Sequence, residues 1–125
     1  MNIHIETINH KDQRYDTAGD WFFDLSGDLY IKVSDTTNWK YNALIALHEL
    51  IEVLLCKDRI ITTEEVDAFD INYENNRKDG DMSEPGDDRN APYFKEHQIA
   101  TVIERLIANE LKVDWETYDK EVLSM

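Results

Sequence analysis

The first third of the chain alternates apolar and polar residues in short runs, a pattern typical of half-buried strands. Residues 3–8 and 29–33 both follow a period of two. The apolar cluster at 20–24 is separated from the second of these runs by a turn sequence containing serine, glycine and aspartate at 25–28. The pattern therefore predicts one strand followed by an antiparallel hairpin.

The rest of the chain follows a helical period. Helices are expected at about 39–56, 62–75, 93–111 and 114–123. Thr62 and Glu65 have the spacing of a capping box at the start of the second helix. The polar segment 76–92 is expected to be a long loop, either solvated or closing over a cleft as a lid. We therefore predict a single α+β domain over 1–125, with N-terminal antiparallel strands and three main helices packed as a bundle.

The first helix contains almost no polar residues. Between positions 43 and 56, 11 of 14 residues are apolar, and the exceptions are His48, Glu49 and Glu52. At 100° per residue these three share one stripe that is flanked by apolar residues. An unpaired carboxylate in such surroundings is costly. We therefore expect the three side chains to line a pocket or an internal cleft.

Two other predicted helices offer partners for this group. Asp70 lies in the inward stripe of the second helix, and His97 and Glu104 lie two turns apart on one side of the third. With His48 and Glu52, they supply the nitrogen and oxygen ligands that suit zinc, manganese or iron. The sequence therefore predicts a divalent metal site, most simply for zinc, with Asp70 as a supporting residue or an alternative ligand.

Each of these residues also has an ordinary interpretation. His48 could be a core histidine bonded to Glu52, and His97 with Glu104 could mark the solvated boundary of an amphipathic helix. In that case the polar cluster would only specify the packing of the core.

The chain is strongly acidic, with 27 Asp and Glu against 13 Lys and Arg and a net charge of −14. Such a charge repels phosphate backbones, which argues against binding to duplex nucleic acid. No apolar run approaches the roughly 18 residues of a membrane span, so we expect a cytoplasmic protein with no membrane partner. Oligomeric state is left open, a homo-oligomer included.

Cysteine and tryptophan usage adds two expectations about the interior. Cys56 is alone within an apolar run, which predicts a packed thiol and no disulfide. Trp21, Trp39 and Trp115 are expected in or near the core.

The strand at 29–33 followed by Leu47-His48-Glu49-Leu50-Ile51-Glu52 resembles the strand and active helix of zincin metallopeptidases, whose motif is H-E-x-x-H. The resemblance implies that His48 is a zinc ligand and Glu49 the general base. Glu52 stands where that family has its second histidine, so the present motif is HExxE. The third ligand would come from His97 or Glu104.

Two further resemblances bear on function. The segment 47–52 is similar to the Leu-His-Asp-x-x-Glu stretch of helical His-Asp phosphohydrolases, which implies a nucleotide phosphoester as a second substrate class. A set of short motifs extends over most of the chain: Gln13-Arg14-Tyr15, Gly19-Asp20-Trp21, His48-Glu49-Leu50-Ile51-Glu52, Glu84-Pro85-Gly86-Asp87, Ala91-Pro92-Tyr93, Glu96-His97 and Ile103-Glu104-Arg105. In these motifs the chain resembles a group of uncharacterised small proteins of tailed phages and prophages, which implies a role in the bacterial host cytoplasm, such as counter-defence.

Three hypotheses follow from the sequence. The first is a metal-dependent hydrolase of a peptide or a small-molecule phosphoester, with Glu49 as the catalytic base. The second is a protein that binds and sequesters a host nucleotide without turnover, through a local basic patch drawn from Arg77, Lys78, Arg89 or Lys95. The third is a structural or interaction module.

Overall fold

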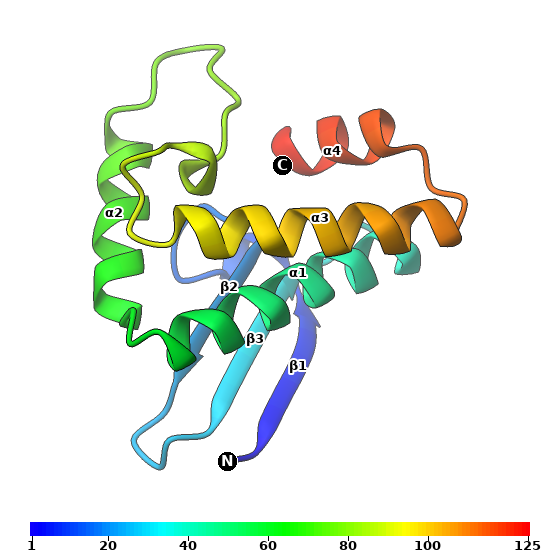
Figure 1. The fold of residues 1–125 in the computed structure, drawn as a ribbon. Coiled ribbons are helices and arrows are strands. Elements are labelled where there is room, and N and C mark those ends of the chain that lie inside the picture. The colour runs from blue at the N-terminus through cyan, green and yellow to red at the C-terminus, as the bar shows by residue number, and fades with distance from the viewer.

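The computed structural model describes residues 1–125 and stacks a three-stranded sheet, a long helix and a second helix as successive layers (Figure 1). The strands are β1 (Ile3–Ile8), β2 (Gly19–Phe23) and β3 (Leu29–Ser34), and the helices are α1 (Trp39–Asp58), α2 (Thr63–Asn75), α3 (Phe94–Glu110) and α4 (Trp115–Leu123). Two 3₁₀ turns, η1 (His10–Asp12) and η2 (Pro85–Asp87), lie in the connecting segments. The α+β class is confirmed.

The strand order is β1-β3-β2, with β2 and β3 forming the predicted antiparallel hairpin. In its turn, the Asp24 carboxylate accepts hydrogen bonds of 2.9 Å from the backbone N–H groups of Ser26 and Asp28. Gly27 adopts a φ of 83°, a conformation that glycine reaches without strain. Local turn chemistry therefore fixes this half of the sheet.

The first strand differs from the expectation, because β1 runs parallel to β3 and pairs from Ile3 with Leu29 onward. The segment 9–18 crosses the end of β3, where the Ser34 N–H donates to the Ala18 carbonyl at 2.8 Å. A period of two reports which face of a strand is buried but says nothing about the direction of its partner. The parallel pairing is therefore set by the crossover.

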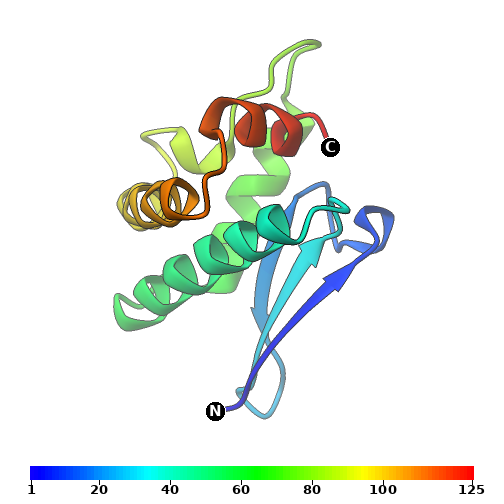
Figure 2. The same ribbon diagram turned by 90° about the vertical axis from the view of Figure 1, so that its right-hand side faces the viewer.

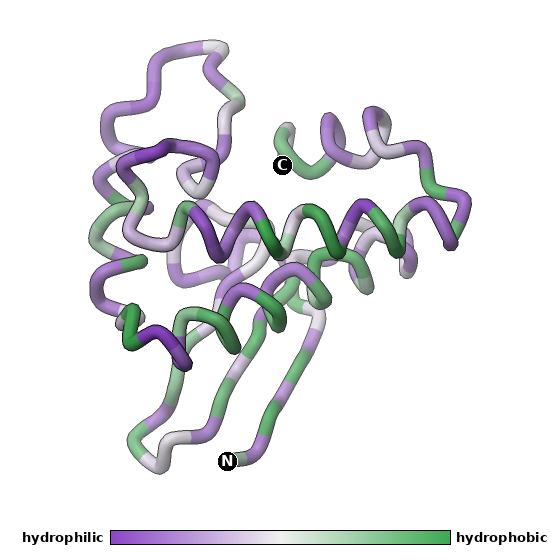
Figure 3. Tube along the Cα trace, in the orientation of Figure 1, coloured by the Kyte–Doolittle hydropathy of each residue, from purple (hydrophilic) through white to green (hydrophobic).

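Helix α1 lies between the sheet and α3 (Figure 2). On the sheet side it covers Leu29, Ile31 and Val33, which are at most 1% exposed. On its other side it packs along α3. A helix that is covered on two sides needs apolar residues around most of its circumference. This requirement explains the apolar stretch of α1. The segment 76–92, in contrast, is largely hydrophilic (Figure 3).

Helix α2 is not a third member of a bundle, which corrects the predicted packing. The helix begins with the predicted capping box. The Thr62 side chain accepts a hydrogen bond from the backbone N–H of Glu65, and the Glu65 side chain accepts one from the backbone N–H of Thr62. It packs against β2 and η2 at one end of the layers instead of along α1 and α3 (Figure 1). Its strongly polar sequence buries only Val66 and Asp70, too narrow a face for a position in a bundle.

Helix α4 turns back over α3 after Lys112, which has a φ of 58°. Tyr118 is 2% exposed and packs against Trp115. Trp21 and Cys56 are also buried, whereas Trp39 is 68% exposed, contrary to expectation, because it begins α1 where neither covering layer reaches it. None of the helices is both long and apolar enough to cross a membrane.

Candidate metal centre

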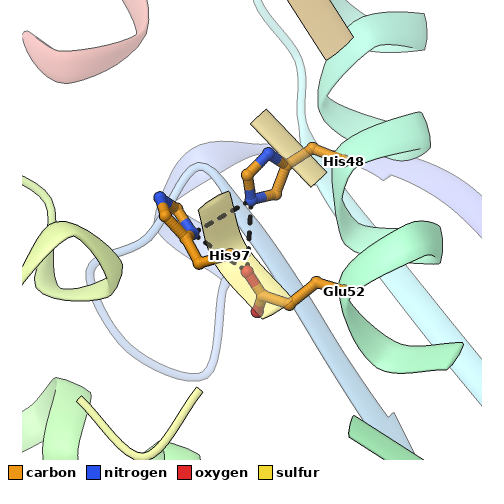
Figure 4. A group of neighbouring side chains, drawn as sticks. All are labelled: His48, Glu52 and His97. Carbon is orange, nitrogen blue, oxygen red and sulfur yellow. Dashed lines mark hydrogen bonds and ion pairs between the residues drawn. The ribbon is translucent and has the colours of Figure 1, made fainter. Parts of the chain in front are cut away.

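Two helices bring three buried side chains together between α1 and α3. His48 and Glu52 are one turn apart on α1 and project from the same side. His97 faces them from the first turns of α3. The atoms His48 Nε2, Glu52 Oε2 and His97 Nδ1 form a triangle with sides of 3.2, 3.0 and 3.1 Å (Figure 4). Three of the residues that the sequence nominated as ligands therefore converge on one point.

Little water reaches this triangle. His48, Glu52 and His97 are 7%, 5% and 6% exposed. Each of the three atoms can present a lone pair to the others, and such atoms repel one another at these separations unless a proton or a cation lies among them. The arrangement therefore needs a proton or a cation among the three atoms.

The far nitrogen of His48 has its own partner. His48 Nδ1 lies 2.7 Å from Glu104 Oε1, and the other oxygen of Glu104 accepts a hydrogen bond from the Tyr118 hydroxyl. A carboxylate accepts only, so His48 carries a proton on Nδ1, and in the neutral ring the Nε2 lone pair faces the triangle. The structure therefore places Glu104, nominated as a ligand, behind His48 and not among the three converging atoms.

Glu52 is held in a similar way. Its Oε1 accepts a hydrogen bond of 3.1 Å from the indole N–H of Trp21 on β2, which leaves Oε2 for the triangle. Trp21 was expected only as a packing residue. Its indole nitrogen, buried on the strand beside α1, is a polar group that needs an acceptor, and this requirement is the signal that could have linked it to the site.

The surrounding charges favour a cation at the centre. Burial opposes charge on His48, but the carboxylates of Glu104 and Glu52 outweigh it and raise the pKa of His48 to about 10. Burial also opposes charge on His97, whose pKa is nevertheless raised by its carboxylate neighbours, Asp87 foremost. Burial would raise the pKa of Glu52, yet the hydrogen bonds with the two histidines lower it to about 2.

The far nitrogen of His97 faces the loop. His97 Nε2 lies 3.1 Å from Glu84 Oε2 and 3.3 Å from Asp87 Oδ1, within ion-pair distance. Neither contact has the direction of a hydrogen bond, and this buried nitrogen has no hydrogen-bond partner. The loop thus reaches the site through two acidic residues, as a lid would, while Asp79 and Asp81 are exposed.

Glu49 lies on another side of α1, toward β2. Its carboxylate passes so close to Gly19 that a Cβ atom there would be 2.7 Å from Glu49 Oε1. Glu49 is half-buried, lines the cavity and has no hydrogen-bond partner for its carboxylate. Burial, followed by the charge of Glu52, raises its pKa well above the usual range. It is therefore a carboxylate that can accept or release a proton close to His48.

Asp70 stands apart from the triangle. Its two oxygens accept hydrogen bonds from the hydroxyls of Tyr15 and Tyr93. Burial raises its pKa to about 7, although the hydrogen bond from Tyr93 acts in the opposite direction. The structure therefore gives Asp70 a place in the wall of the cavity and in a hydrogen-bond network of its own.

The site opens into a cavity of about 540 Å³ that reaches from the segment before β2 to α4. Twelve of its lining residues are Asp or Glu, and two are Arg. Arg77 is occupied by Glu74, to which it donates hydrogen bonds of 2.9 and 2.7 Å. Arg105 lies over the ring of Trp115. The cavity therefore presents a mainly negative surface to a ligand.

No protein-family model, curated protein or solved structure matched the chain in three comparisons.

Proposed function

We propose that the protein is a metal-dependent hydrolase in which His48, Glu52 and His97 hold a divalent cation, most simply zinc, and Glu49 acts as the general base. The convergence of Nε2, Oε2 and Nδ1 at 3.0–3.2 Å carries this proposal. Ligand atoms around tetrahedral zinc are separated by about 3.3 Å, given zinc–ligand distances of about 2.0 Å. The three distances between the converging atoms are close to that spacing.

The donor set supports the same conclusion. Two imidazoles and one carboxylate form the ligand set of several catalytic zinc sites, and three protein ligands leave a fourth position for water. Ligating histidines almost always donate their other N–H to a carboxylate or carbonyl, as His48 does to Glu104. Glu52 takes the place of the second histidine of H-E-x-x-H, and His97 supplies the missing imidazole from α3.

A bound divalent cation would lower the pKa of its water to the neutral range. Glu49 is then the residue that accepts the proton, because its carboxylate is free of other partners and its pKa is raised. A base works best when its pKa lies near the operating pH. After bond cleavage, the protonated Glu49 returns the proton to the leaving group.

The cavity favours a peptide over a nucleotide as the substrate. Its acidic lining repels phosphate groups, and its two arginines are occupied by Glu74 and Trp115. The same charge attracts a basic peptide. This also weakens the case for nucleotide sequestration, because Arg77 is not free for a ligand. We therefore propose an amide bond, in a neutral or basic peptide, as the substrate class.

Metal analysis of protein purified without a histidine tag is the first test. We expect close to one zinc, manganese or iron per chain in the wild type, and loss of that metal in His48→Ala. The metal-loaded protein should cleave a mixture of basic peptides. Absence of copurified metal, together with no change in melting temperature when zinc is added, would refute the proposal.

A further inference from the structure

His97 offers a nitrogen to each of two acidic neighbourhoods. Nδ1 faces His48 and Glu52, and Nε2 faces Glu84 and Asp87 on the other side of the ring. The ring is 6% exposed, and Nε2 is buried without a hydrogen-bond partner. A buried nitrogen aimed at two carboxylates, with no hydrogen bond formed, is a coordination position outside the triangle that Nδ1 forms with His48 and Glu52.

A 3₁₀ turn in the loop holds the two carboxylates close to His97 Nε2. Glu84 precedes the 3₁₀ turn η2 and Asp87 ends it, and residues three apart in such a turn fall on the same side. Between them, Gly86 lies against the imidazole of His97, where a Cβ atom would be 2.4 Å from Nδ1. Gln98 on α3 fixes one carboxylate by donating to Asp87 Oδ1 at 2.9 Å.

A third carboxylate, Asp119 on α4, lines the same cavity as Glu84 and Asp87. Glu84 and Asp87 remain 33% and 54% exposed at the side chain, so a hydrated ion can reach them from solvent. The surroundings of Nε2 are thus rich in oxygen ligands, negative and open to water.

We propose that Glu84, Asp87 and the Nε2 atom of His97 form a second divalent-cation site at the mouth of the cavity, distinct from the inner triangle. Ligand atoms from the three residues lie within 4.8 Å of one another. One nitrogen and several carboxylate oxygens suit Mn²⁺, which prefers harder ligands than zinc. This site uses neither His48 nor Glu52, so its test does not require the inner triangle to bind metal.

Sharing one imidazole couples the two sites. A neutral imidazole has a lone pair on one nitrogen and a proton on the other. When Nδ1 serves the inner triangle, Nε2 carries the proton and points it at Glu84 and Asp87. When Nε2 binds a cation, Nδ1 carries the proton toward Glu52. An ion at one site therefore weakens binding at the other.

The test uses Mn²⁺ alone and follows the loss of the free Mn²⁺ signal in electron paramagnetic resonance. The background is His48→Gln with Glu52→Gln, which disables the inner triangle but keeps side chains that can hydrogen-bond to Glu104 and Trp21. We expect this variant to bind one Mn²⁺ per chain. Adding Glu84→Gln with Asp87→Asn should weaken that binding by about 10-fold or more, as loss of metal ligands does.

Asp79→Asn with Asp81→Asn is the matched control, because it removes the same charge from exposed positions of the same loop outside the cluster. It should change Mn²⁺ affinity by less than about twofold, since exposed charges at a distance are screened by salt. In the wild type, one equivalent of zinc should release bound Mn²⁺.

Three results would overturn the outer site. One is no Mn²⁺ binding by the folded His48→Gln, Glu52→Gln variant, and another is equal weakening by the matched control. The third is retained binding after both loop carboxylates are neutralised. If the double background does not fold, His48→Gln alone provides the same comparison. A wild type without bound zinc or hydrolysis would end the proposed function but leave this measurement unaffected.

Discussion

Glu49 and Glu52 are three residues apart on α1, yet the two sides of the helix treat a carboxylate in opposite ways. Glu52 turns toward α3 and has three partners, His97 on α3, His48 on its own helix and Trp21 on β2, and its pKa falls to about 2. On the side facing β2, Glu49 has none, and its pKa rises. Pairs of titratable groups whose surroundings separate their pKa values are typical of acid–base sites. One carboxylate is fixed as an anion, while the other is free to move a proton.

The largest expected effect comes from exchanging each carboxylate for its amide. Glu52→Gln should lower zinc affinity by more than about 100-fold, because it removes a charged ligand and not merely a neighbour of one. Glu49→Gln should leave zinc affinity within about threefold and reduce peptide hydrolysis by about 1000-fold, the range expected for loss of a general base. Zinc titration and initial rates on the same preparations measure both. Equal loss of metal in the two variants would remove the distinction between the two sides.

Asp70 extends the comparison to a third buried carboxylate, paired with hydroxyls instead of cations. Its folded pKa of about 7 exceeds the value of about 3.9 expected when unfolded, so the folded state holds the proton more tightly. Its effect on stability is therefore unfavourable above pH 7, and folding stability is lost as the pH rises from about 4 to 7. Asp70→Asn should stabilise the protein by about 2 to 4 kcal/mol at pH 8 and have little effect at pH 4. Urea denaturation at the two pH values checks this, and a gain of the same size at both would contradict it.

Substitution of Glu104 tests the role of a residue that hydrogen-bonds to a metal ligand, here His48. Glu104→Gln keeps an acceptor for the Nδ1 proton of His48 but removes the charge, and we expect zinc affinity to fall by about 10- to 100-fold. Glu110→Gln, an exposed position on the same helix, is the control and should leave affinity unchanged. Isothermal titration of zinc into both variants makes the measurement. A fall in both variants would point to the net charge of the protein instead of the bond to His48.

The smallest effect is expected at the loop. Glu84→Gln with Asp87→Asn should change zinc affinity at the inner triangle by less than about threefold, because half-exposed ion pairs outside hydrogen-bond direction contribute little. A loss of zinc affinity as large as that in Glu104→Gln would show that the loop carboxylates hold His97 as firmly as Glu104 holds His48. The same zinc titration decides.

The pattern of apolar and polar positions along the chain was sufficient to predict the local structure. The period of two in β3, the turn before it and the capping box of α2 act within a few residues, and each was found at the predicted place. The apolar stretch around His48 and Glu52 indicated burial because only a helix covered on two sides tolerates it. The spacing of residues along α3 placed His97 on the inward side.

What the sequence could not determine depended on partners distant in the chain. The direction of β1, the isolation of α2 and the exposure of Trp39 follow from how the layers stack, which no local period records. At the site, only the fold separated Glu104, behind His48, from the three atoms that converge. The residues that complete the arrangement, Trp21, Tyr118, Glu84 and Asp87, come from a strand, a terminal helix and a loop.

The physical reason is the range over which each interaction acts. Helix and turn preferences are settled by contacts within about four residues, so the sequence by itself determined which segments are helices and indicated the burial of His48 and Glu52. Hydrogen bonds and charges depend on distances of a few ångströms between groups far apart in the chain, such as His48 and Glu104, which are separated by 56 residues. The tertiary structure therefore decided which carboxylate would be held as an anion and which would remain free to take a proton.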